Sequence, residues 1–153
     1  MQLGFMVGQT MLKKHRTWRL MKELYDYSDL LLVFFGHFNE ILVKSEKYGG
    51  LQRRETQMRG FKDMVDYCSV THLGNHGERF TWQRGGTKER LDCFLADCWW
   101  SNKFPSVEVK MLPRYHSDYN ALLLSTERRS LEHSDEKAFR FEPIWLTDEG
   151  CAQ

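Results

Sequence analysis

Leu30-Leu-Leu-Val-Phe-Phe35 is the longest strongly apolar run of the sequence, and Gly36 closes it. A short apolar run that ends at a glycine is typical of a strand buried on both faces of a sheet. Ahead of it, the spacing of Leu20, Leu24 and Tyr27 predicts an amphipathic helix over about residues 10–27. A helix followed by a buried strand indicates an α/β fold.

The stretch after this strand predicts a second helix and then several short strands. The helix begins near Arg54, because apolar residues from Met58 to Cys68 return to one of its faces. Phe80 and Trp82 then alternate with polar residues, and two glycines break the run before it resumes, which predicts a hairpin. The strands are expected at residues 80–83, 90–95, 107–111 and 121–124, the last buried on both faces like the first.

The sequence has 153 residues, the length of one domain, with 41% apolar and 28% charged side chains. No run approaches the roughly 18 apolar residues of a membrane span, so no membrane helix is expected. Residues 1–126 are predicted to form the α/β domain, and residues 127–153 a charged linker that leads through Phe139-Arg-Phe-Glu-Pro-Ile-Trp145. Four cysteines with no secretory signal ahead of them indicate reduced thiols, hence a nuclear or cytoplasmic rather than a secreted protein.

The charges are nearly balanced, with 22 Lys and Arg against 21 Asp and Glu. The basic excess is local, since the first predicted helix carries Lys13, Lys14, Arg16 and Arg19. These side chains are candidates for contacts with the phosphates of DNA. The alternative is that they form the solvated face of an ordinary helix.

Candidate site residues follow the first buried strand, where ligands gather in α/β sheets. His37 offers a base that titrates near neutral pH, Asn39 an amide donor for an anionic oxygen, and Glu40 a ligand for a hard cation. The alternative is an ordinary turn from strand to loop.

Two aspartates extend this candidate site. If the strand at 121–124 lies beside the first strand, Asp118 is expected close to Asn39, where its carboxylate could hold Mg²⁺ or orient a base. Asp92 sits between two apolar residues and is expected to point away from them, toward a loop-lined end of the sheet. The alternatives are a turn-capping role for Asp118 and an ion pair between Asp92 and Arg90.

Zinc is a weaker interpretation. Cys68, His72 and His76 are spaced by four residues, as ligands on one helical face would be. Gly74 and Gly77 interrupt that helix, and no second motif completes a ligand set. We therefore do not expect a zinc site.

Read in order, many short segments resemble the endonuclease/exonuclease/phosphatase superfamily, most closely the endonuclease region of plant LINE-type (non-LTR) retrotransposon polyproteins. The resemblance runs from about residue 3 to residue 147 and covers the C-terminal part of that domain. Its last segment resembles the stretch that leads toward reverse transcriptase. The segments are His15-Arg-Thr-Trp18, Gly36-His-Phe-Asn-Glu-Ile-Leu42, Ser45-Glu-Lys-Tyr-Gly-Gly50, Phe80-Thr-Trp82, Glu89-Arg-Leu-Asp92, Phe104-Pro105, Leu112-Pro-Arg114, Ser117-Asp118 and Phe139-Arg-Phe-Glu142 with Trp145.

The resemblance assigns roles to these segments. The family's Asp-x-Asn pair becomes His37 and Asn39, so the acid that positions the attacking water is replaced and the phosphate-aligning amide is kept. The family's Ser-Asp-His becomes a Ser-Asp-Tyr ending at Tyr119, so Asp118 is kept and the histidine that pairs with the acid at Asp92 is replaced. A family tyrosine would fall at Met6.

The same resemblance implies a partial four-layer α/β sandwich without nuclease activity. The family hydrolyses DNA phosphodiesters with Mg²⁺, and the glutamate that holds the metal belongs to an N-terminal half-sandwich with no counterpart in this sequence. Asp118 alone is expected to bind Mg²⁺ weakly. We therefore expect a degenerate pseudoenzyme, which self-associates through apolar surface that the missing half would cover. The alternatives are a weak Mg²⁺-dependent nuclease that uses His37 as base, and a nucleic-acid-binding module without catalysis.

Overall fold

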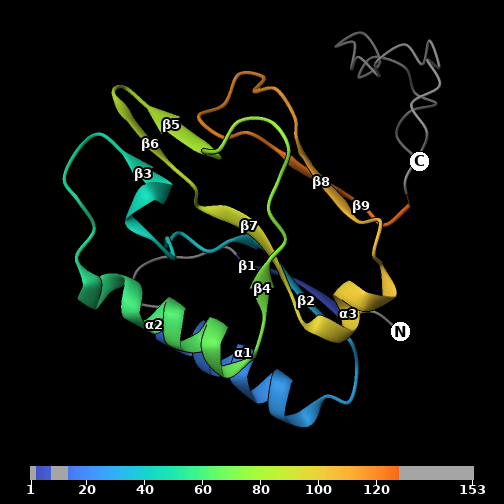
Figure 1. Ribbon diagram of the computed structural model, residues 1–153. Helices are drawn as coiled ribbons and strands as arrows, with labels where there is room; N and C mark the ends of the chain where they lie inside the picture. Colours follow the sequence, from blue (N-terminus) through green and yellow to red (C-terminus); the bar gives the residue numbers. More distant parts are fainter. Residues whose placement is uncertain (1–2, 8–13, 128–153) are drawn as a thin grey trace, which may run out of the picture.

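The computed structural model describes residues 3–7 and 14–127 and shows a mixed α/β fold (Figure 1). The helices are α1 (Lys14–Tyr27), α2 (Glu55–Tyr67) and α3 (Cys98–Lys103), with a 3-10 turn at Lys44–Glu46. The strands are β1 (Leu3–Val7), β2 (Leu32–His37), β3 (Lys47–Tyr48), β4 (Thr71–His72), β5 (Trp82–Arg84), β6 (Thr87–Glu89), β7 (Asp92–Ala96), β8 (Glu108–Met111) and β9 (Leu122–Ser125). None of the described helices has the length and apolarity that a membrane crossing requires.

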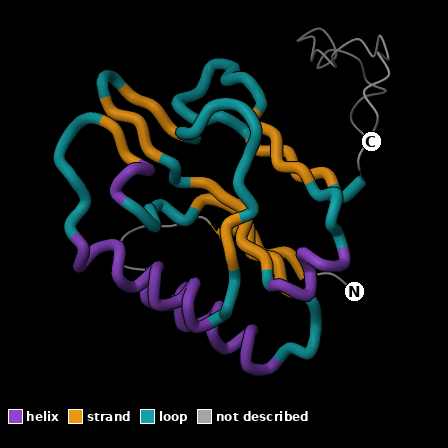
Figure 2. Tube along the Cα trace, viewed as in Figure 1, coloured by secondary structure: helices purple, strands orange, loops and turns teal. Residues whose placement is uncertain are grey.

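A four-stranded sheet with the order β1-β2-β7-β4 forms the centre of the fold. β1 runs parallel to β2, whereas β7 is antiparallel to both β2 and β4. β3, β6 and β5 form a second small sheet, and β8 pairs with β9 in a third. Figure 2 shows the two long helices together on one side of these strands.

Alternation along β2 divides the core between the two faces of the central sheet. Phe34 is fully buried in a cluster with Trp18 of α1, Phe61 of α2 and Leu95 of β7. The neighbouring Val33 faces the other way and packs with Ala96 and Trp100 of β7 and α3. α1 and α2 therefore cover one face of the central sheet, while α3 covers part of the other face.

Most predicted elements are confirmed. The first helix is found from Lys14 onward, residues 8–13 being outside the described part, and the second begins one residue after Arg54. A hairpin across the two glycines is found as β5 and β6, but the prediction that residues 90–95 form its second strand is wrong. β6 supplies that strand, and the predicted run becomes β7 of the central sheet. The predicted linker after Glu127 lies outside the described residues.

The first buried strand is displaced by two residues from its predicted bounds. Its first ladder residue is Leu32, whose N–H donates to the Asp97 carboxylate at 2.7 Å. Leu30 stays in the connection, where its N–H donates to the Ser28 hydroxyl at 3.2 Å. The apolar run therefore includes part of a loop.

The prediction of a second strand buried on both faces at 121–124 is wrong. β9 pairs with β8 in a two-stranded sheet, and Leu123 is 51% exposed. The two edges of β2 are occupied by β1 and β7, so β9 has no place beside it. A four-residue apolar run carries no signal for this difference.

The second face of the central sheet is only partly covered. The rings of Phe35 and Phe94 stack at 5.5 Å between centroids, and both side chains are half-buried. With residues 120–122 they line a pocket of about 260 Å³. This apolar pocket lies immediately behind the end of β2 that carries His37.

Substitutions at two adjacent phenylalanines test this division of the core. We expect Phe34→Ala to lower the free energy of unfolding by about 3–5 kcal/mol, as for other fully buried phenylalanines. Phe35→Ala should cost less than half as much, because its ring already contacts solvent. Urea unfolding followed by tryptophan fluorescence measures both, and equal losses would contradict the assignment of faces.

Candidate functional site

The candidate site is centred on a contact between the last residue of β2 and the first residue of β7. The antiparallel register sets His37 opposite Asp92, and His37 Nδ1 lies 3.0 Å from Asp92 Oδ1. Both side chains are about a quarter exposed, 27% for the histidine and 20% for the aspartate. The alternative ion pair of Asp92 with Arg90 is wrong, since the Arg90 guanidinium contacts Glu46 and donates to the Arg79 carbonyl.

Tyr119 is the third member of this site. Its ring meets the His37 imidazole edge to face, with 5.4 Å between centroids. A single antiparallel bridge to Trp82 holds its backbone against β5. Burial and then the carboxylates of Asp92 and Asp118 raise the pKa of the Tyr119 hydroxyl. The hydroxyl is therefore protonated at neutral pH and can donate a hydrogen bond.

A buried threonine positions the start of β7. Thr81 is fully buried, and its hydroxyl accepts hydrogen bonds from the Leu91 N–H at 2.9 Å and the Asp92 N–H at 3.0 Å. Sequence reasoning placed Thr81 in a family segment without assigning it this role. The other carboxylate oxygen of Asp92, Oδ2, is buried and has no hydrogen-bond partner among the described residues.

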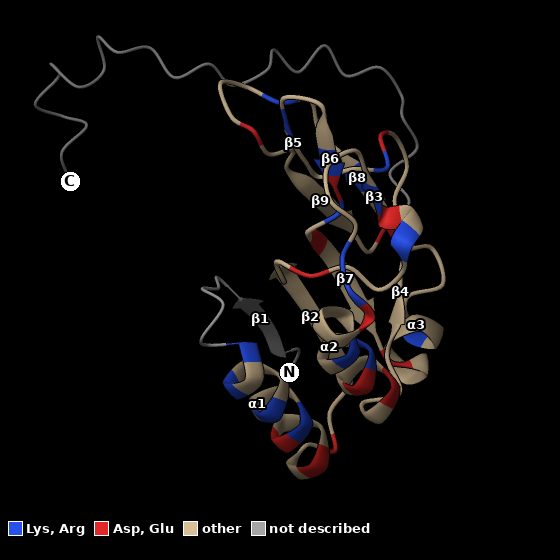
Figure 3. Ribbon diagram, turned by 90° about the vertical axis from the view of Figure 1, so that its left-hand side faces the viewer, with Lys and Arg blue, Asp and Glu red and all other residues tan. Residues whose placement is uncertain are grey.

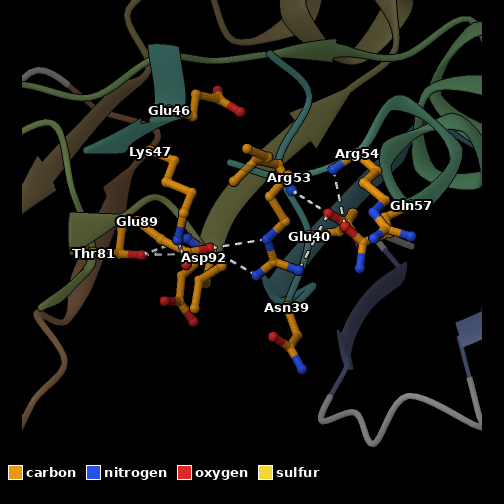
Figure 4. Close-up of polar contacts among 12 residues, drawn as sticks. Asn39, Glu40, Glu46, Lys47, Arg53, Arg54, Gln57, Thr81, Glu89 and Asp92 are labelled. Atoms are coloured by element: carbon orange, nitrogen blue, oxygen red, sulfur yellow. Dashed lines mark hydrogen bonds and ion pairs between the residues drawn. The ribbon is translucent and has the colours of Figure 1, made fainter. Parts of the chain in front are cut away.

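Asn39 lies two residues beyond β2 in a left-handed conformation, with φ of 50°. Its backbone carbonyl accepts a hydrogen bond from the Lys14 ammonium. Figure 4 shows its side-chain amide pointing away from the charged groups around Arg53 and Glu40. Asn39 therefore stands at the same end of the sheet as His37 without a described contact to Asp92.

A chain of buried ion pairs lies beside Asn39 (Figure 4). Lys14 contacts Glu40 at 2.9 Å, Glu40 contacts Arg53 at 3.5 Å, and Arg53 contacts Glu89 at 2.7 Å. Lys47 also contacts Glu89. Burial alone would raise the pKa of Glu89, but hydrogen bonds from Lys47 and Arg53 lower it below the ordinary value. Opposite charges satisfy one another here, as buried charges require.

These ion pairs correct two predictions. Lys14 is buried against Glu40, so it does not offer its charge to DNA. Glu40 faces two protein cations and is not free to bind a metal cation. Of the other predicted DNA contacts, Arg16 is exposed, Arg19 pairs with Glu23 on the surface, and Lys13 lies outside the described residues.

Asp118 was predicted to lie close to Asn39 if β9 lay beside β2. That condition is not met, because β9 pairs with β8 instead. The Asp118 carboxylate is half exposed and lies 4.0 Å from the Arg84 guanidinium. Its neighbour Tyr119 is the residue that contacts His37. Met6, the expected counterpart of a family tyrosine, lies in β1 opposite Phe35 in the register.

The candidate carboxylates of the described residues each face another group of the chain. Asp92 faces an imidazole, Asp118 faces a guanidinium, and Glu40 faces an ammonium and a guanidinium. Within residues 3–7 and 14–127, no three His, Cys, Asp or Glu side chains are grouped as metal ligands. Mg²⁺ prefers several well-placed oxygen ligands, and this arrangement does not fit that preference.

The residues considered for zinc are also dispersed. Cys68 ends α2 and is buried, with its thiol directed to the Met21 carbonyl. His72 lies in β4, and His76 is exposed in the following loop. The interruption predicted at Gly74 is confirmed, since its φ is 73°.

Three segments distant in the sequence thus meet at one end of the central sheet. They supply His37, Asp92 and Tyr119, with Asn39 close by in the chain. No protein-family model matches the sequence, and no curated protein matches it. The geometry of the described residues is therefore what bears on function.

His72 makes stability depend on pH. Its Nδ1 accepts the Gly74 N–H at 2.7 Å, and burial, then the charge of Arg90, lower the pKa of its imidazole to about 4. The His72 imidazole takes up a proton near pH 6.5 in the unfolded chain but only near pH 4 in the folded chain. The free energy of unfolding therefore decreases as the pH falls between these values.

We therefore expect His72→Asn to flatten this dependence by about 2 kcal/mol between pH 7 and pH 4.5, because the amide oxygen accepts the same N–H without titrating. Urea unfolding at both pH values measures the difference. His15→Asn, which changes an exposed histidine of α1, is the matched control. An unchanged pH dependence in His72→Asn would contradict the assignment.

Substitution of Thr81 tests how β7 is positioned. Thr81→Val leaves the N–H groups of Leu91 and Asp92 without an acceptor and should cost about 2 kcal/mol or more. Thr81→Ser keeps the hydroxyl and should cost about 1 kcal/mol for one lost methyl group. Thermal unfolding compares the two variants, and similar losses would show that the hydroxyl is not the important group.

Proposed function

We propose that this chain is a catalytically silent part of an endonuclease/exonuclease/phosphatase-type domain of LINE retroelement origin, its sheets forming part of a four-layer α/β sandwich. The observation that carries this proposal is the meeting of His37, Asp92 and Tyr119. In the resemblance these positions belong to three separate family segments that act on one phosphodiester. Their contact at one end of the central sheet supports the interpretation that the three segments belong to one site.

The replacements at two of these positions support loss of catalysis. At position 37 the resemblance expects an acid that positions water, and here an imidazole directs Nδ1 to Asp92. At position 119 it expects a histidine that pairs with Asp92, and here a protonated tyrosine contacts the imidazole. Asp92 thus keeps a histidine partner, but that partner comes from β2.

The retained acids support loss of metal binding. Phosphodiester hydrolysis needs positive charge on the phosphate and stabilisation of the charge that develops during attack. In this chain Glu40 pairs with Lys14 and Arg53, and Asp118 lies 4.0 Å from Arg84. A metal ion would have to displace those contacts before it could act.

A weak nuclease is the second candidate function, and one observation favours it. The contact with Asp92 orients the His37 ring as an acid orients a general base. The His37 side chain is 27% exposed, so the ring is in part accessible to water. A positioned base contributes about 10²–10⁴-fold, which leaves residual activity detectable only with a sensitive assay.

Nicking of supercoiled plasmid with Mg²⁺ and with EDTA separates the two candidates. We expect no difference between these conditions for the purified chain. Nicking that needs Mg²⁺ and disappears in His37→Ala would establish the weak nuclease and overturn the silent form of the proposal. Phe35→Ala, which changes the pocket behind His37 and no ionisable group, is the matched control.

The double variant His37→Asp, Tyr119→His restores both family motifs and should still not hydrolyse DNA. Two carboxylates would face each other across the β2–β7 register, and a histidine at 119 could pair with Asp92. The resemblance assigns none of the described residues to the family's metal-holding glutamate, so the charge on the phosphate is expected to remain unneutralised. Plasmid nicking near background is the expected result, and strong Mg²⁺-dependent cleavage would show that these two substitutions alone silence the site.

A further inference from the structure

The connection between β8 and β9 presents a basic and aromatic surface that the proposed site does not use. Arg114, Tyr115 and His116 are all exposed, Tyr115 by 85%. The rings of Tyr115 and His116 meet edge to face at 4.4 Å between centroids. His116 has φ of 48°, a conformation that non-glycine residues adopt at a cost. The loop therefore exposes a large aromatic ring beside a residue of constrained backbone conformation.

The C-terminal end of this loop is hydrogen-bonded to β5 and to the residues just before it. The Gln83 N–H donates to the Asp118 carbonyl at 2.9 Å, and the Asn120 N–H donates to the Thr81 carbonyl at 2.7 Å. The Asn120 amide also donates to the Phe80 carbonyl at 3.0 Å. An anchored loop loses less conformational entropy on binding than a free one.

Cationic side chains lie on the same loop as the exposed ring and on the β5–β6 hairpin that this loop contacts. The Arg114 guanidinium lies 3.5 Å from the Gln83 side-chain oxygen, which sets it beside β5. Arg84 is 78% exposed at the end of β5, and Lys88 stands opposite Gln83 on β6. Asp118 is the acid that faces this group, so the three basic residues leave it positive. Figure 3 shows Lys and Arg positions around β5 and β6.

We propose that Arg84, Arg114 and Tyr115 form a binding surface for single-stranded nucleic acid at the edge of the candidate site. The Tyr115 ring stacks on a base, and the two guanidinium groups contact phosphates. A single strand fits better than a duplex, because only unpaired bases expose a face to an aromatic ring. This inference deepens the proposed function and rests on it for the class of ligand.

Fluorescence anisotropy with a labelled oligothymidylate of about 12 nucleotides, in EDTA, tests this surface. Tyr115→Ala should weaken binding about tenfold or more, and Tyr115→Phe should bind as the wild type does, because stacking needs the ring and not the hydroxyl. Tyr27→Ala is the matched control, since Tyr27 is 90% exposed at the far end of α1. Arg114→Gln should reduce the dependence of log Kd on log salt by about 0.7, the value for one phosphate contact.

The inference would be overturned by absence of binding by the wild-type chain, by wild-type affinity in Tyr115→Ala, or by tighter binding of the matching duplex that does not depend on Tyr115. Equal competition by a polyglutamate peptide would also overturn it, because the surface would then select charge alone. All variants change exposed residues, and unchanged thermal unfolding verifies that they fold. Plasmid nicking tests catalysis separately, so failure here leaves the silent-nuclease proposal standing.

Discussion

The antiparallel register between β2 and β7 sets Phe34 opposite Leu95 and His37 opposite Asp92. The first pair lies in the core under the helices, and the second forms the candidate site at the end of the sheet. A shift of one residue would turn Phe34 toward the partly open face and carry His37 away from Asp92. The fold and the site therefore depend on the same hydrogen-bonded ladder, and burial of Phe34 is what stabilises the geometry of the polar pair.

The buried ion pairs connect the rest of the chain to this ladder. Lys14 begins α1 and holds the carbonyl of Asn39 and the carboxylate of Glu40, which follow β2. Arg53 extends the connection to Glu89, the last residue of β6. Loss of one partner would leave a buried charge uncompensated, which costs more than a surface ion pair is worth. Lys14 and Glu40, which the sequence suggested as contacts for DNA and for a metal ion, pair with other residues of the chain at this end of the sheet.

Local patterns in the sequence were sufficient for the elements whose burial is periodic. Met58 and Phe61 predict the buried face of α2, and the strand before Gly36 is displaced by only two residues. Sheet neighbours were not predictable in this way, because pairing depends on contacts distant in sequence. β9 shows this, since Leu122–Ser125 has the composition of a central strand and lies in a two-stranded sheet. The burial of Lys14 was missed for the same reason, because Glu40 is 26 residues away.

The contact between His37 and Asp92 also bears on the proposed origin of this end of the sheet. If position 37 held an acid, the register would bring two carboxylates face to face, and each would raise the pKa of the other unless a cation lay between them. An imidazole at this position replaces that repulsion with a hydrogen bond of 3.0 Å. Tyr119 then packs its neutral ring against the imidazole, where a second histidine would compete for the same carboxylate. Under the proposed function the two substitutions are thus mutually consistent, because together they stabilise the end of β2 and β7 with the protein's own groups.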